Sequence, residues 1–199
     1  MDDPSDPRAR GVNHACCPPL ARGDLWIFGY GSLMWNPGFE YLRAQPALLH
    51  GYHRSFCVYS TRYRGTPEQP GLVLGLDRGG CCRGIAFRVA DEQVEAVLQM
   101  LWEREMPRLV YTPRMVPVVL DAEKTTALTF VANRLHESYA GALELAQVAR
   151  TIADCSGARG PNADYLFNTL RHLEAVGIRE RRLDALRQAV QALQRPRER

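Results

Sequence analysis

The apolar run LWIFG ends at Gly29 and is followed by four residues that could form a ligand site: Tyr30, Gly31, Ser32 and Leu33. Glycines tolerate positive φ angles, so successive backbone N–H groups in such a segment can turn toward one point and bind an anion or the oxygen of a polarised carbonyl. The segment therefore suggests an oxyanion hole. A tight strand-to-loop turn without a ligand explains the same residues equally well. A nucleotide site is disfavoured, because the third glycine of the dinucleotide fingerprint and the Gly-Lys-Ser/Thr of a phosphate loop are missing.

Glu105 is a candidate general base. It ends a helical pattern whose apolar stripe contains Val94, Val97, Leu98 and Leu101. At 100° per residue, Glu105 lies near the middle of this stripe. A carboxylate on an apolar face is costly to bury unless it is paired or its pKa rises, and a raised pKa suits a base working near neutral pH. In the alternative interpretation, the helix frays before Glu105, and the carboxylate reaches solvent or pairs with Arg104 or Arg108.

The cysteines and histidines do not indicate a metal or redox site. The six cysteines include two vicinal pairs and no Cys-x-x-Cys motif, which argues against a zinc ribbon and a thioredoxin-like site. We expect free thiols, with Cys57 packed as a small buried residue. His50 and His53 are three apart in a strand-like segment, so they would face opposite sides and could not share a metal.

Hydrophobic periodicity predicts the elements that must position these residues. Strands are expected at 25–29, 51–60, 72–77, 82–89, 110–119 and 125–132, with Asp77-Arg78-Gly79-Gly80 as a hairpin turn between two of them. Helices are expected at 91–105, 140–154, 162–175 and 179–194. Because strands fill the first two thirds and helices the last third, we expect an α+β fold: a small mixed or antiparallel β-barrel with helices packed outside it.

Length and composition favour one domain. A chain of 199 residues with 46% apolar content can bury a substantial core. Residues 1–23 carry Pro, Gly, Arg and Asp without apolar periodicity, so we expect a flexible leader followed by a single domain over 24–199. Near the C-terminus, Leu183, Leu186 and Val190 mark an amphipathic helix. We expect it to pack on its own domain, which favours a monomer over a dimer.

The charge balance and the N-terminal sequence restrict the possible partners. The chain has 25 basic and 22 acidic residues, a net charge of +3, which is too small for a nucleic-acid-binding surface. The N-terminal MDDPSDPRAR lacks the apolar core of a secretory signal, and no run approaches the length of a membrane span. We therefore expect a cytoplasmic protein that binds neither nucleic acid nor membrane.

Several segments resemble the ChaC family of glutathione-specific γ-glutamylcyclotransferases. The family signature Y-G-S-L is intact at Tyr30 to Leu33, within the more specific context F-G-Y-G-S-L-x-W. Three further segments are similar to family strands and to the polar loop between them: GYHRSF (51–56), STRYRGTPEQPG (60–71) and GIAFRV (84–89). The segment GARGPNADYLFNTL (157–170) resembles the family's G-x-N-x-x-Y-L.

The pair Arg104-Glu105 matches the position of the family's catalytic glutamate. The following residues depart from the family pattern, because many members have glycines there and this chain has Met106-Pro107. The resemblance implies a γ-glutamylcyclotransferase-like fold and cleavage of glutathione to 5-oxoproline and Cys-Gly, with no cofactor and no metal. Glu105 would be the general acid and base of this intramolecular aminolysis, and the backbone of Tyr30 to Leu33 would bind the γ-glutamyl group.

Four more side chains are weaker candidates. Tyr165 could contact the substrate or Glu105, or could be a core aromatic residue. Arg62 and Arg64 could meet a substrate carboxylate, although exposed loop arginines are usually solvated. Asn162 is interpreted as the N-cap of the helix that begins there.

Two other functions fit the same residues. A cyclotransferase for another γ-glutamyl peptide or amine would use the same Glu105 and glycine segment, so only a substrate panel separates it. A noncatalytic γ-glutamyl-binding regulatory protein would instead keep its ligand affinity after Glu105→Gln and would show no turnover.

Overall fold

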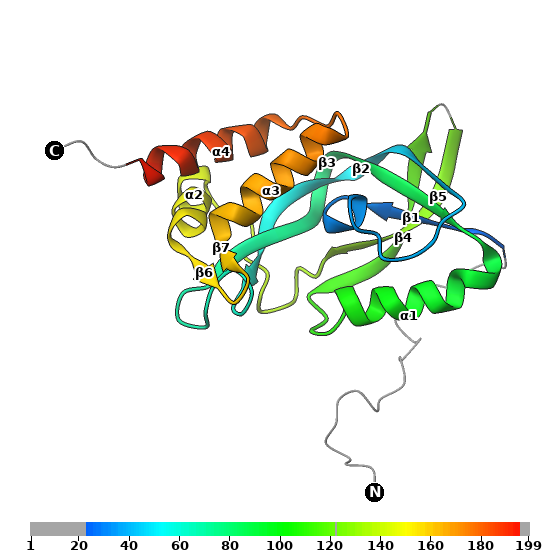
Figure 1. Ribbon diagram of the computed structural model, residues 1–199, viewed down its shortest axis with the longest axis horizontal. Helices are drawn as coiled ribbons and strands as arrows, with labels where there is room; N and C mark the ends of the chain where they lie inside the picture. The colour runs from blue at the N-terminus through cyan, green and yellow to red at the C-terminus, as the bar shows by residue number, and fades with distance from the viewer. Residues whose placement is uncertain (1–22, 122, 196–199) are drawn as a thin grey trace, which may run out of the picture.

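The computed structural model describes residues 23–121 and 123–195 (Figure 1). Apart from Gly23, the leader expected over 1–23 lies outside the described residues. Five strands close into a barrel in the order β1-β3-β2-β4-β5. Their bounds are β1 Leu25–Gly29, β2 Arg43–Ser60, β3 Gly71–Val89, β4 Tyr111–Leu120 and β5 Glu123–Ala132. The expectation of an α+β barrel is confirmed.

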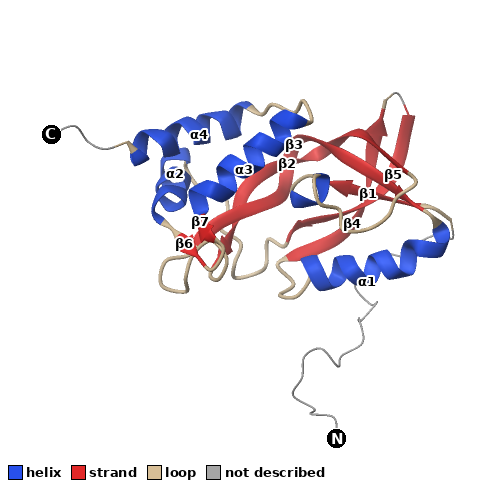
Figure 2. Cartoon of the chain, viewed as in Figure 1, coloured by secondary structure: helices blue, strands red, loops and turns tan. Residues whose placement is uncertain are grey.

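Helices cover the barrel on two sides. They are α1 Val94–Glu105, α2 Leu145–Asp154, α3 Asn162–Ala175 and α4 Arg181–Gln194. Figure 2 shows α2, α3 and α4 gathered at one end, over the long arms of β2 and β3, while α1 lies along the barrel itself. The short strands β6 (Ser156–Gly157) and β7 (Gly160–Pro161) pair with each other just before α3. None of the helices in the described ranges is long and apolar enough to cross a membrane.

The barrel closes through its first strand. β1 pairs antiparallel with β3 along its whole length and parallel with β5 at Trp26 and Ile27. The other barrel ladders, β2 with β3, β2 with β4 and β4 with β5, are antiparallel. β1 is therefore held from both sides at Trp26 and Ile27, and at Gly29, where the chain leaves it, by β3.

The prediction of a hairpin turn at Asp77 to Gly80 is wrong. β3 continues through these residues, and its ladder with β2 shifts register between His50 and Tyr52. Gly79 and Gly80, both with positive φ, stand opposite Gly51 alone, so the glycine pair forms a β-bulge instead of a turn. The same bulge interrupts the alternation of β2, which explains why its first half was not expected.

Other boundaries differ by smaller amounts. α2 begins at Leu145 instead of residue 140, because Gly141 has a φ of 72° that cannot continue a helix. The expected helix at 91–105 opens with a 3₁₀ turn, η4 (Asp91–Gln93), before α1. α3 has the expected bounds.

Three clusters of buried side chains hold these layers together. One fills the barrel, with Phe28, Leu49 and Leu76 among its members. A second lies between the barrel and α1 and includes Leu101 and Phe130. The third joins α2, α3 and α4 to β2 and β3; it contains Leu183, Leu186 and Val190, so the apolar stripe of α4 packs on its own domain as expected.

Candidate active site

A small pocket brings together most of the residues expected from the sequence. Its volume is about 60 Å³. It is lined by Tyr30, Gly31, Ser32, Leu33, Leu74, Glu105, Tyr111, Phe130 and Tyr165. The segment after β1, the end of α1, the start of β4 and the first turn of α3 therefore meet at one point. Leu74, Tyr111 and Phe130 were not expected; they arrive from β3, β4 and β5.

Gly29, at the end of β1, and Gly31, just after it, matter because they lack a side chain where other groups lie close to the backbone. Neither Gly29 nor Gly31 has a positive φ, which corrects the expectation of left-handed backbone here. A Cβ on Gly29 would lie 3.1 Å from the Cβ of Leu33, so glycine lets the next turn fold back tightly on the strand end. A Cβ on Gly31 would meet only Leu74 Cδ1, at 3.9 Å. Because Gly31 lines the pocket, its missing side chain leaves space for a ligand beside the backbone.

This segment forms a single 3₁₀ turn, η3 (Ser32–Met34). The amide of Met34 donates to the carbonyl of Gly31 at 2.9 Å. The first N–H groups of such a turn have no carbonyl partner within it, and the amides of Ser32 and Leu33 belong to residues that line the pocket. On the other side, the buried guanidinium of Arg54 donates to the carbonyl of Tyr30. The backbone is thus fixed before any ligand arrives.

Glu105 both lines the pocket and forms an ion pair. Its side chain is 19% exposed, and its Oε1 lies 3.1 Å from Arg104 Nε. Burial raises the pKa of the Glu105 carboxyl, and the charge and hydrogen bond of Arg104 oppose this shift. The raised pKa expected from the apolar stripe is therefore present, together with the arginine pairing that the alternative interpretation described.

Arg104 connects the base to the glycine segment. Its Nη2 donates to Ser32 Oγ at 2.8 Å, and its Nη1 donates to the carbonyls of Asn36 at 2.7 Å and Pro37 at 3.2 Å. One guanidinium thus fixes Glu105 relative to the backbone donors. The sequence placed Arg104 beside Glu105 but could not show the loop that it binds.

Three tyrosines surround Glu105. Burial is the largest cause of a raised pKa for each of them: the pKa values of Tyr30 and Tyr111 lie well above the usual range, and that of Tyr165 rises to about 12. Tyr111 donates its hydroxyl proton to the carbonyl of Leu74 at 2.8 Å. All three hydroxyls stay protonated at neutral pH; the proton of Tyr111 is already donated to Leu74, which leaves Tyr30 and Tyr165 as possible donors to a ligand. Tyr165 is therefore at the pocket, as the family resemblance implied.

Arg62 and Arg64 do not line the pocket. Arg64 Nη1 donates to the carbonyl of Arg159 at 2.7 Å, and its guanidinium lies 5.3 Å from the ring centroid of Tyr165. Arg64 therefore supports a pocket residue from outside. Arg62 lies over the ring of Tyr63, at 5.5 Å.

The interpretation of Asn162 as an N-cap is wrong. Asn162 is the first residue of α3, and its side chain is fully buried. Its Oδ1 accepts from the amide of Leu72 and its Nδ2 donates to the carbonyl of Leu72, both at 2.7 Å. The amide therefore binds α3 to β3, the strand that carries Leu74 into the pocket.

The cysteines within the described part of the chain are free thiols, and only Cys81 is exposed. Burial raises the pKa of Cys57 to about 12, so this thiol stays protonated and packs as expected. Cys16 and Cys17 lie outside the described residues. Within 23–121 and 123–195, no group of three His, Cys, Asp or Glu side chains could hold a metal ion.

Comparison with known proteins gives consistent matches over nearly the whole described chain. Residues 25–193 match the model of the ChaC-like protein family. A glutathione-specific γ-glutamylcyclotransferase of Escherichia coli is 39% identical, over 90% of this chain and 77% of the relative. Glutathione-specific γ-glutamylcyclotransferase 1 of mouse is 35% identical, over 88% of this chain and 83% of the relative.

A solved structure supports the fold. The crystal structure of a yeast γ-glutamyl cyclotransferase specific to glutathione superposes with a TM-score of 0.76, covering 86% of this chain and all of the yeast chain. The two sequences are 22% identical, so this likeness concerns the arrangement of the barrel and helices.

Proposed function

This chain belongs to the ChaC-like family, and from that membership we propose that it is a glutathione-specific γ-glutamylcyclotransferase with Glu105 as general acid and base. The observation that carries the proposal is the pocket itself, which is lined by a carboxylate of raised pKa together with Ser32 and Leu33, whose backbone amides have no partner within the η3 turn. A base and a set of oxyanion donors in one small pocket are what an intramolecular acyl transfer requires.

The proposed reaction needs no nucleophile from the protein. Glu105 takes a proton from the α-ammonium of the γ-glutamyl group, and the freed amine nitrogen attacks the γ-carbonyl carbon. The carbonyl oxygen becomes negatively charged, and the amides of Ser32 and Leu33 donate to it. Glu105 then returns the proton to the cysteinyl nitrogen as the C–N bond breaks, and the ring nitrogen gives up its second proton, which ends on the freed amine of Cys-Gly. The products are 5-oxoproline and Cys-Gly, and no water is consumed.

The dimensions of the pocket fit this chemistry. A pocket of about 60 Å³ is too small for a whole tripeptide, so the proposal places the γ-glutamyl end at the pocket and Cys-Gly at its mouth. Confinement favours the curled form in which amine and carbonyl meet, and such orientation contributes up to roughly 7–11 kcal/mol in tethered reactions. In this proposal the hydroxyls of Tyr30 and Tyr165 supply further donors inside the pocket.

Arg62 and Arg64 have indirect roles in this proposal. Both lie outside the pocket lining, so they are not needed at the γ-glutamyl end. Arg64 supports Tyr165. Arg62 is placed on the polar loop that follows β2, where it could meet the glycine carboxylate of the protruding Cys-Gly.

We further propose a single domain from residue 24 onward that works as a cytoplasmic monomer on a small-molecule substrate. Free thiols among the described cysteines suit a reducing compartment. The packing of α4 on its own domain leaves its apolar stripe covered without a partner.

The test is to incubate chelator-treated protein with glutathione and quantify 5-oxoproline and Cys-Gly, beside a folded Glu105→Gln variant. We expect equal amounts of both products from the wild type and almost none from the variant. Turnover that persists in the variant would contradict the role of Glu105. If glutathione is inert but a γ-glutamyl dipeptide or amine is cyclised, the substrate assignment is wrong, and binding without turnover of any of these compounds would indicate a binding protein.

A further inference from the structure

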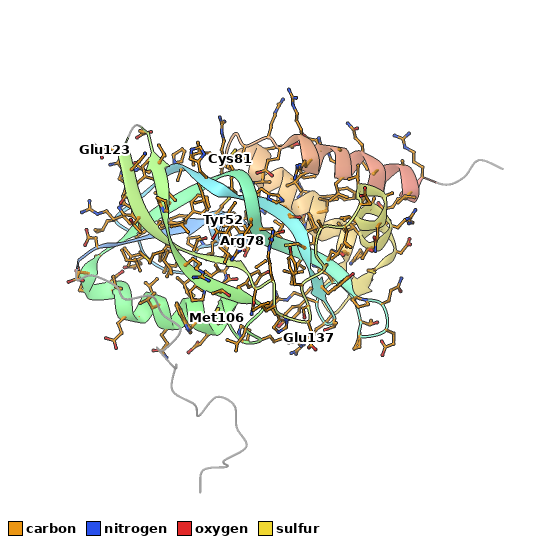
Figure 3. All side chains as sticks on the ribbon, turned by 180° about the vertical axis from the view of Figure 1, so that it is seen from behind. Tyr52, Arg78, Cys81, Met106, Glu123 and Glu137 are labelled. Carbon is orange, nitrogen blue, oxygen red and sulfur yellow. The ribbon has the colours of Figure 1, made fainter. Side chains whose placement is uncertain are left out.

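A second, larger cavity system lies away from the Glu105 pocket. Two adjoining cavities, of about 480 and 520 Å³, share the lining residues His53, Arg54, Arg78 and Arg182, so they form one groove. We call it the β2–α4 groove, because strands β2 and β3 supply one wall and α4 supplies the other. Figure 3 shows Arg78 on the rear of the molecule, where the barrel meets the helical layer. The groove shares no lining residue with the Glu105 pocket.

The groove is strongly cationic. Five arginines line it: Arg54, Arg78, Arg134, Arg181 and Arg182. Its two carboxylates are already neutralised, because Asp77 pairs with Arg134 at 2.7 Å and Glu180 pairs with Arg54. Within the described chain, no carboxylate lies at ion-pair distance from Arg78, Arg181 or Arg182. These three guanidinium groups are therefore available to an anion from solution.

The cavity of about 480 Å³ also has an extensive apolar wall. Its apolar lining residues are Phe56, Ala142, Leu143, Leu145, Val148, Leu183, Ala185 and Leu186. A volume of about 480 Å³ lies within the range of small-molecule sites. A simple inorganic anion would leave this wall in water. A fitting ligand has a multiply charged anionic end and an apolar body.

Phosphate chemistry suits the charged end. Guanidinium groups bind phosphate oxygens through paired N–H donors, and a polyphosphate chain can engage several arginines at once, whereas a single carboxylate offers one such edge. His53 lines both cavities beside the same arginines, and its Nδ1 donates to the carbonyl of Gly79 at 3.0 Å. A heterocycle attached to a polyphosphate combines the two required ends.

Arg54 connects the groove to the Glu105 pocket. Its guanidinium is buried, pairs with Glu180 on the groove side and donates to the carbonyl of Tyr30 at the start of the glycine segment. It also donates through Nη2 to the carbonyl of Arg83 at 2.7 Å. The Arg54 side chain is fully buried, so an anion in the groove acts on it through Glu180, whose carboxylate is partly exposed and lines the groove. Repulsion between the anion and this carboxylate shifts the ion pair, and any movement of the guanidinium changes the support of the glycine segment.

We propose that the β2–α4 groove binds a nucleoside polyphosphate, with the phosphates at Arg78 and Arg182 and the base against the apolar wall, and that binding lowers turnover through Arg54. The binding claim stands independently of the proposed function. The claimed effect on turnover rests on the proposed function.

The first experiment measures binding by calorimetry, with the full-length protein in EDTA and with ATP, tripolyphosphate and adenosine as separate probes. We expect ATP to bind more tightly than either part alone. The double variant Arg78→Gln/Arg182→Gln should weaken ATP binding at least about tenfold, because both charge-assisted contacts are lost. Arg171→Gln is the matched control, since Arg171 is an exposed arginine of α3 outside the groove. No ATP binding, or equal binding by the double variant, would overturn the site.

The second experiment follows 5-oxoproline formation from glutathione with and without ATP. We expect inhibition of the wild type and of Arg171→Gln, and none of the double variant, whose basal turnover stays unchanged. Inhibition that persists in the double variant would mean competition at the Glu105 pocket and would overturn the proposal. Binding without inhibition would overturn the coupling through Arg54. If glutathione is not turned over at all, the proposed function fails, while the calorimetry still decides the binding site.

Discussion

The Glu105 pocket and the β2–α4 groove share a strand but differ in how they hold charge. β3 contributes Leu74 to the pocket and Arg78 to the groove. In the pocket, one carboxylate is withdrawn from water among three tyrosines, and its arginine is fixed by backbone carbonyls. In the groove, three arginines have no carboxylate partner among the described residues. A buried single charge is suited to moving a proton, whereas several exposed charges are suited to binding an anion.

Among variants that test the difference between the pocket and the groove, Glu105→Gln should have the largest effect. The variant lacks the proton acceptor, so we expect kcat/KM for glutathione to fall by about 10²–10⁴-fold. ATP binding in the groove should not change, because the two sites share no lining residue. Equal loss of turnover and of ATP binding would show that the two regions form one site.

A methyl group on Gly31 tests whether the pocket depends on its free space. Gly31→Ala places a Cβ 3.9 Å from Leu74 Cδ1, so the fold should tolerate it. The methyl group displaces the γ-glutamyl group from the amides of η3, and a displacement of about 1 Å can cost roughly 10²-fold in rate. We expect the melting temperature to stay within the wild-type range while kcat/KM falls. A fall in stability with normal kcat/KM would contradict this interpretation.

Arg104→Gln tests the link between the base and the glycine segment. Arg104 lowers the pKa of Glu105, so its removal should raise that pKa further and move the acid limb of kcat/KM to higher pH. Lost positioning of Ser32 should also reduce kcat, by about tenfold for one charge-assisted contact of roughly 1.5 kcal/mol. Arg104→Lys should restore part of the pH profile but little of the positioning. An unshifted acid limb would show that the ion pair does not act on the base.

The buried charge of Glu105 should also appear in thermal stability. Its pKa is raised in the folded state, so its contribution to stability is present below the ordinary carboxyl pKa and is lost as pH rises through the raised value. Glu105→Gln should therefore melt higher than the wild type at neutral pH, with the difference vanishing in acid; each kcal/mol corresponds to about 2–4 °C. Glu95→Gln, at an exposed position of α1, is the control. A difference that is constant across pH would exclude a titration effect.

The smallest effect is expected at Arg62. Because Arg62 does not line the pocket, Arg62→Gln should leave kcat unchanged. If its guanidinium meets the glycine carboxylate, KM for glutathione should rise by about threefold to tenfold, the range for an exposed charge pair of roughly 1 kcal/mol, and KM for a γ-glutamylamine should not. A change in kcat would place Arg62 nearer the reacting atoms than the structure does.

The pocket residues that could be predicted from the sequence are those whose pattern lies within one short segment of the chain. Glu105 continues an apolar stripe that can be followed along one helix, and Tyr30 to Leu33 form one short motif, so both were found. Leu74, Tyr111 and Phe130 reach the pocket from three different strands, and only barrel closure brings them together. The partner of Arg104 is likewise a loop far away in the sequence.

The wrong predictions of a hairpin at Gly79-Gly80 and of an N-cap at Asn162 have a common physical cause. In each case the same residue type is favoured in two different local structures. Gly79-Gly80 suits both a hairpin turn and a bulge with positive φ, and the long pairing of β2 with β3 decides for the bulge. Asparagine is favoured at N-caps, yet the Asn162 side chain is buried and forms both of its bonds with Leu72. Burial depends on the tertiary fold and has no local signal at that position.

The double pairing of β1 affects how the protein is synthesised. β1 leaves the ribosome first among the strands, but its parallel partner, Ala127 and Leu128 of β5, is made about a hundred residues later. Such distant contacts form late, because a long loop must close before they are gained. The segment η3 and the side chain of Tyr165 therefore come together only after β5 and the start of α3 have been synthesised. A nascent chain would be unable to degrade cellular glutathione before its barrel has closed.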